Sequence, residues 1–146
     1  YEVLNKASLG GGPTVHDATS MKLGGSFALG QGTTLGAVFE NMDLGGNTGD
    51  RNAWYLSGMH TMGDVNLKAA YAAADEWSGA SQANTGATQF SLGAGYNLSK
   101  ATEAYALYTQ VSNDASGGYG LESIAGFADK DVSSFSLGLK HKFSSK

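Results

Sequence analysis

The strongest constraint on the fold is a two-residue alternation near the end of the chain. In residues 135–143 an apolar or aromatic side chain occupies every second position, and Ser, Gly and Lys lie between them. Successive side chains of a β-strand point to opposite faces, so this strand has one apolar face and one small or cationic face. A soluble sandwich can use such a strand. Its recurrence along the chain, and its aromatic end, are typical of a strand with lipid on one side and water on the other.

The same alternation recurs in six earlier segments. We expect strands of about nine to twelve residues, near the ~9–11 that a tilted strand needs to cross a bilayer. In the least regular segment, the pattern favours Ala104, Ala106 and Tyr108 on the apolar face. The six segments lie within residues 21–29, 34–40, 54–62, 65–72, 89–98 and 102–111.

The connections between these segments alternate in length. Tight turns are expected at residues 30–33, 62–64 and 98–101. Long stretches rich in Gly, Ser, Asn and Asp lie at about residues 9–18, 43–51, 74–87 and 113–131. Outer-membrane barrels show this asymmetry, with short periplasmic turns and longer external loops. The sequence therefore predicts an all-β, antiparallel, up-and-down transmembrane barrel wall of seven strands, with a short eighth strand within residues 1–9.

The composition of the chain argues against several classes of function. The chain of 146 residues is 41% hydrophobic, and it contains no run of the ~18–20 apolar residues that a spanning helix needs. Its net charge is −4 and it has no Cys, so neither a basic stripe for nucleic acid nor a cysteine metal site is present. No phosphate-binding loop or nucleophile elbow is present either. We expect one domain over residues 1–146, which is not an enzyme and has no cofactor, no metal site and no catalytic residues.

Two sets of candidate site residues follow from the predicted faces. Charged side chains on the polar face would line a water-filled pore and set its ion preference, although they could also be passive, solvated parts of a wet interior. The predicted pore-lining residues are Lys22, Glu40, Lys68, Glu103, Lys140 and Lys142. Aromatic residues near predicted strand ends would form a lipid-facing girdle, or simply pack on the barrel surface. These are Trp54, Tyr71, Tyr96, Tyr108 and Phe143.

Two motifs resemble the Gram-negative trimeric general porins. Residues 96–100, with the alternation that follows to Tyr108, are similar to a hairpin of this family (YNLSKRT, then LYA and Tyr). Residues 138–143 are similar to its GLRHRF ending, with Lys140 and Lys142 in place of both Arg. Residues 23–27 and 56–60 resemble its repeated LGASY strands more weakly. The resemblance extends over about residues 19–143.

This resemblance implies more than the residues show. Porins of this family have sixteen strands and assemble as trimers, and the present segments correspond to their second half. The implied function is an outer-membrane channel for passive diffusion of small hydrophilic solutes and ions, with outer-membrane lipid as a partner. A pore-wall role for Lys140 and Lys142 is implied because the family has Arg at both positions. The inward loop that narrows such pores belongs to the other half. Residues 144–146 follow the Phe that ends the family's chains.

Two other interpretations remain open at this point. The chain could be a complete eight-stranded outer-membrane barrel that serves as a structural anchor or adhesin. Such a narrow barrel is filled by side chains, and Gly, Ser and Ala on the polar face would fill it poorly. It could also be a soluble, lipocalin-like binder with its apolar face turned inward, but the Gly-, Ala- and Ser-rich opposite face argues against a charged exterior.

The barrel interpretation predicts how the chain behaves without detergent. Because the apolar faces would meet water, we expect the chain not to stay monodisperse in detergent-free buffer. Size-exclusion chromatography with circular dichroism measures this. A sharp monomer peak with an intact β spectrum would contradict the prediction.

Overall fold

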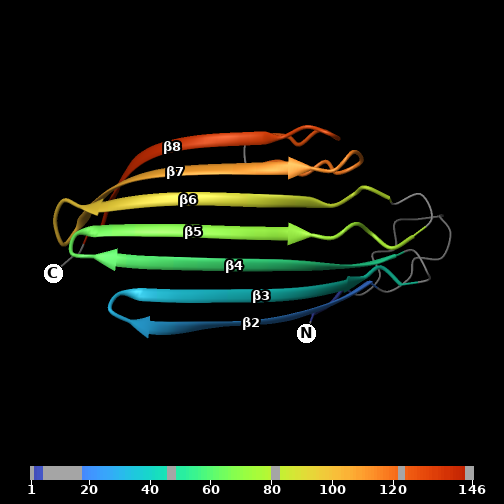
Figure 1. Ribbon diagram of the computed structural model, residues 1–146, viewed down its shortest axis with the longest axis horizontal. Coiled ribbons are helices and arrows are strands. Elements are labelled where there is room, and N and C mark those ends of the chain that lie inside the picture. Colours follow the sequence, from blue (N-terminus) through green and yellow to red (C-terminus); the bar gives the residue numbers. More distant parts are fainter. Residues whose placement is uncertain (1, 5–17, 46–48, 80–82, 122–123, 144–146) are drawn as a thin grey trace.

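Eight strands form a single antiparallel sheet in which neighbours in sequence are neighbours in space (Figure 1). The computed structural model describes residues 2–4, 18–45, 49–79, 83–121 and 124–143. The strands are β1 (Glu2–Leu4), β2 (Ala18–Gly30), β3 (Thr33–Asp43), β4 (Asp50–Met62), β5 (Val65–Ala74), β6 (Ala87–Asn97), β7 (Thr102–Asn113) and β8 (Val132–His141). The predicted all-β, up-and-down order is confirmed, with seven long strands and the short β1 paired to β2.

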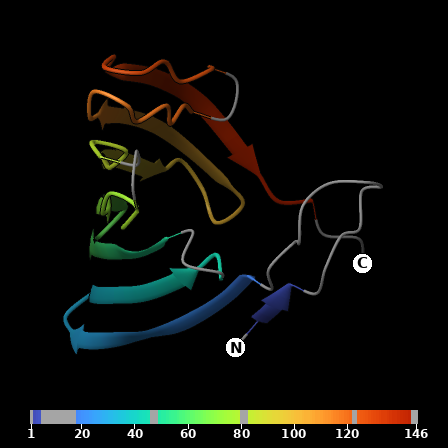
Figure 2. The ribbon, with the colours of Figure 1, turned by 90° about the vertical axis from the view of Figure 1, so that its right-hand side faces the viewer.

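The sheet is curved but open. Figure 2, turned by 90° from Figure 1, shows the strands following one another around an arc from β2 to β8. Within the described residues, β8 pairs only with β7, and the sheet does not close on itself. This arrangement differs from the complete eight-stranded barrel, in which the first and last strands would pair.

No helix in the described part of the chain could cross a membrane.

Tight turns and long connections alternate as expected. The short turns join β2 to β3, β4 to β5 and β6 to β7 at one end of the sheet (Figure 1). In the first of them Gly30 and Gly32 both have a φ of +79°, a conformation that glycine adopts without steric cost. Gly32 also accepts a hydrogen bond from the Thr61 N–H at 2.9 Å, and a Cβ at Gly32 would collide with the Thr61 carbonyl. This turn is therefore anchored to β4 at a position where only glycine fits.

The register sorts the side chains into two faces, because directly opposed residues of antiparallel strands lie on the same face. One continuous row contains Phe27, Leu35, Gly58, Ala69, Leu92, Tyr108 and Phe135. We call the side that carries this row the apolar face. A row on the other side contains Ser26, Gly36, Ser57, Ala70, Ser91, Thr109 and Ser134. We call that side the polar face. The alternation read from the sequence matches this division in every long strand.

The large apolar side chains do not form an interior core. Among the described residues, Val111 and Val132 are the buried hydrophobic residues, whereas Leu23 and Leu137 on the apolar face are each 72% exposed. On the inner strands large side chains of both faces are similarly exposed, such as Leu67 at 42% on the apolar face and Tyr55 at 42% on the polar face. An exposed apolar surface of this kind needs to be covered by a membrane or by another protein.

Ala69 and Ala70 provide a matched test of the two faces. Ala69 lies opposite Gly58 and Leu92 on the apolar face, and Ala70 lies opposite Ser57 and Ser91 on the polar face. If lipid covers the apolar face, Ala69→Arg should destabilise the protein by about 2–4 kcal/mol, whereas Ala70→Arg should be nearly neutral. Urea-induced unfolding in lipid vesicles measures both values. Equal effects of the two substitutions would contradict the assignment of faces.

Candidate functional site

The polar face carries charged groups that come from different strands. Lys22 on β2 and Glu40 on β3 are direct partners in the register, and their Nζ and Oε1 atoms are 3.3 Å apart. The Ser20 hydroxyl donates a second hydrogen bond to the same Oε1 at 2.8 Å. The cross-strand pairing thus places two predicted pore-lining residues in contact.

Glu103 and Lys140 form a second cross-strand pair on the polar face, because β7 and β8 place them directly opposite. Glycines beside them leave room for side chains to lie along the wall. The Glu103 carboxyl group lies over Gly95, and the Tyr105 ring lies over Gly138, in each case where a Cβ would collide. Small residues thus let longer polar side chains flatten against the sheet.

Lys68 projects from β5 on the same face, beside a hollow of about 380 Å³. Lys142 differs from the other predicted pore-lining residues because it follows the end of β8. Its N–H donates to the Ala101 carbonyl at 2.8 Å, which fixes the backbone beside the β6–β7 turn. The roles of all six residues in a pore stay predictions.

The predicted girdle residues differ in where they lie along their strands. Trp54, Tyr71, Tyr96 and Tyr108 all lie on the apolar face. Tyr71 lies close to the loop end of β5 and Tyr96 close to the turn end of β6. Tyr108 lies near the middle of β7, so its expected place near a strand end is wrong. The reason is that β7 continues to Asn113, beyond the predicted strand. Phe143 follows β8 and packs against His141, with ring centroids 4.5 Å apart.

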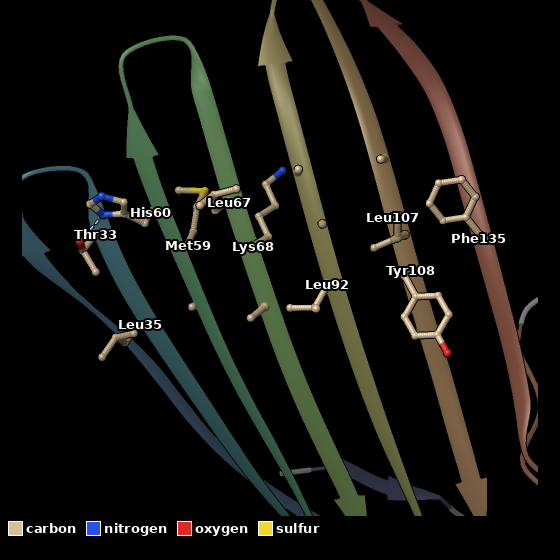
Figure 3. Close-up of a pocket in the computed structure, with 15 residues that line it drawn as sticks. Thr33, Leu35, Met59, His60, Leu67, Lys68, Leu92, Leu107, Tyr108 and Phe135 are labelled. Atoms are coloured by element: carbon tan, nitrogen blue, oxygen red, sulfur yellow. Dashed lines mark hydrogen bonds between the residues drawn. The ribbon is translucent and has the colours of Figure 1, made fainter.

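The apolar face has its own hollow of about 560 Å³ over β3 to β8 (Figure 3). Its lining includes the large side chains of Leu67, Leu92 and Tyr108 and the small residues Gly58 and Ala69. His60 is hydrogen-bonded there to the Thr33 hydroxyl, with Nδ1 and Oγ1 2.7 Å apart (Figure 3).

Sequence reasoning missed Arg51, which lies on the polar face opposite Met42. Its Cζ is 4.4 Å from the ring centroid of Trp77 and 5.6 Å from that of Tyr119, within the range of cation–π attraction. Its Nη1 donates to the Tyr119 hydroxyl. The sequence did contain a signal for Arg51, since continuing the alternation backward from Tyr55 places it on the polar face. The predicted strand began too late, at residue 54.

Cations outnumber acids on the polar face of the described strands, by four to three. The cations are Lys22, Arg51, Lys68 and Lys140, and the acids are Glu2, Glu40 and Glu103. Charged groups on the wall of a water-filled passage bias the ions that enter it. In the described part of the chain, no group of three or more His, Asp or Glu side chains could hold a metal ion. The arrangement is suited to guiding charged solutes past a wall.

Comparisons with known proteins agree with this geometry. The family model described as "Gram-negative porin" matches residues 3–116. The anion-selective porin from Comamonas acidovorans is similar in structure, with a TM-score of 0.73 and 25% sequence identity, over 87% of this chain. The chain spans 40% of the length of that porin. A comparison with curated proteins found no match. Because the family model covers most of a two-faced antiparallel sheet, the chain belongs to the Gram-negative porin family of the bacterial outer membrane.

Proposed function

We propose that the chain forms part of the wall of a water-filled channel for passive diffusion of small hydrophilic solutes and ions, with a preference for anions. The observation that carries the proposal is the split between an apolar face and a polar face with four cations and three acids. Solutes would pass along the polar face while lipid covers the apolar one. A wall of this kind moves solutes without bond chemistry, as expected of a channel rather than an enzyme.

The open sheet supports a wide barrel over a narrow one. Unpaired backbone groups cost several kcal/mol each in hydrocarbon, on the order of their hydrogen-bonding energy. The free edge of β8 therefore needs another strand beside it, and the β1–β2 edge does too. We propose that residues 1–146 are one segment of a wider barrel and that further strands complete it. The span of 40% of the porin from Comamonas acidovorans supports this proposal.

The composition of the polar face supports the same conclusion. Its central row is made of Ser, Gly, Ala and Thr. Eight strands closed around such short side chains would leave their interior poorly filled, although small barrels fill theirs with side chains. The small-barrel anchor or adhesin thus has less support. Channel recordings separate the two, because a filled small barrel would not conduct.

The sign of the proposed selectivity rests on charge. Excess positive charge on the wall would raise the local concentration of anions. The structural neighbour is named as anion-selective, which supports the proposal without extending to the identity of the solute. A homotrimeric assembly is also proposed, on the resemblance to trimeric porins.

The proposal predicts the effect of reversing two wall charges. In the full-length protein, Lys140→Glu and Lys142→Glu should shift the reversal potential toward cations, because each substitution replaces a positive wall charge with a negative one. Planar-bilayer recordings in a salt gradient measure this shift. Lys100→Glu is the matched control, since Lys100 lies exposed in the β6–β7 turn and its substitution should have a smaller effect.

An unchanged reversal potential in the Lys140 and Lys142 variants would show that these residues are passive parts of the wall. Absence of any conductance in the unmodified full-length protein would overturn the proposed function itself.

A further inference from the structure

The connection between β7 and β8 contains a segment that lies over the polar face instead of projecting away from the sheet. The segment comprises residues 116–120. Below it, at the loop ends of β7 and β8, are the most buried side chains of the described wall. Val111 is 2% exposed, Val132 is 8% exposed and Thr109 is 9% exposed. All three lie on the polar face. Such burial on the face that carries Lys22 and Lys68 requires a cover at this end.

The same segment reaches far across the sheet. Tyr119 and Gly120 border a cavity of about 250 Å³ whose other walls include Val38 on β3, Tyr55 on β4 and Gln89 on β6. These three residues are on the polar face. The segment that follows β7 therefore shares a cavity with β3, β4 and β6, and the Tyr119 side chain reaches Arg51 on β4.

Hydrogen bonds fix the backbone of this segment at Ser116 and at Tyr119. The Asn113 side chain accepts from the Tyr119 N–H at 2.8 Å and donates to the Tyr119 carbonyl at 2.9 Å. It also donates to the Lys130 carbonyl at 2.8 Å. The Ser116 N–H donates to the Asn84 carbonyl of the β5–β6 connection at 2.7 Å. One side chain thus closes the connection on itself, and the neighbouring loop supports it.

Arg51 provides the contact between the Tyr119 side chain and the wall at β4. Its guanidinium lies near the Trp77 and Tyr119 rings, at 4.4 Å and 5.6 Å from their centroids. It also donates a hydrogen bond to the Tyr119 hydroxyl, and its Nε is buried. A planar guanidinium can stack on rings and direct a hydrogen bond at once, which the ammonium of lysine cannot do. Arg51 therefore acts on Tyr119 through its shape as well as its charge.

We propose that residues 116–120 are an inner wall that narrows the channel near the external loops, and that Arg51 is the positioning residue that holds them there. The proposal rests on the proposed channel function. It assigns the Tyr119 segment as a determinant of conductance, so that solutes pass between this segment and the rest of the barrel.

Three substitutions in the full-length protein test this inference in planar bilayers. Arg51→Lys keeps the positive charge but loses the stacking and the directed hydrogen bond. We expect it to raise single-channel conductance while the reversal potential stays unchanged. Tyr119→Ala should also raise conductance, because it removes the ring that spans to Arg51. Tyr96→Ala is the matched control on the apolar face and should leave conductance unchanged. If Arg51→Lys leaves conductance unchanged, Arg51 acts only as a charge and the inference is overturned.

A chemical measurement tests the position of the segment independently of conductance. Residues 1–146 contain no Cys, and Ala72→Cys in a full-length protein without other Cys places a single thiol in the cavity beneath Tyr119. A water-soluble methanethiosulfonate should modify this thiol faster when Arg51→Lys or Tyr119→Ala is also present. Equal rates would show that the segment does not cover Ala72 and would overturn the inference. If the unmodified protein does not conduct but the rates differ, the channel function fails while the Arg51-held cover stands.

Discussion

A chain that crosses a bilayer as strands must satisfy its backbone N–H and C=O groups by pairing, because the hydrocarbon offers no water to replace them. In this protein that constraint is met by long, continuous ladders from β2 to β8. The one irregularity in the β2–β3 ladder lies beside the turn, at Ala28 and Gly30. With the ladders in register, the period of two divides every long strand into the same two faces. Both the lipid-facing surface and the charged wall depend on that division.

The sequence predicted the strands and their faces because the responsible signal is local. In a strand of a barrel wall every second residue faces lipid and must be apolar. This pattern can therefore be read from each strand alone, without knowing which strands lie beside it. The sequence placed Lys22 and Glu40 on the polar face, and the register of β2 and β3 brings the two residues into contact. Strand ends were less predictable, because residues beyond the hydrocarbon need not alternate. Tyr108 was misplaced along β7 for that reason.

The contacts of Arg51 could not be predicted from the sequence in the same way. The cluster joins Arg51 on β4 to Trp77 in the β5–β6 connection and Tyr119 in the β7–β8 connection. The two connections that carry the aromatic residues have no periodic pattern. Gly, Ser and Asn in these loops indicate turns but not the direction in which a loop folds. Extending the alternation back from Tyr55 would have placed Arg51 on the polar face, whereas the folded structure was needed to show what packs on it. The faces of the wall could be predicted because they depend on the local residue pattern. The inner cover could not, because it depends on packing between segments that are distant in the sequence.

The division into two faces is tested most directly by a single-cysteine spin-label scan along β6 of the full-length protein in lipid bilayers. Residues 1–146 contain no native Cys, so in a full-length protein without other Cys each label reports one site. Oxygen concentrates in lipid, whereas a nickel chelate stays in water. We predict high collision rates with oxygen at Phe90, Leu92 and Ala94, and high rates with nickel at Ser91 and Gly93. Rates without a two-residue period, or with the opposite phase, would contradict a wall that faces lipid on its apolar side and water on its polar side.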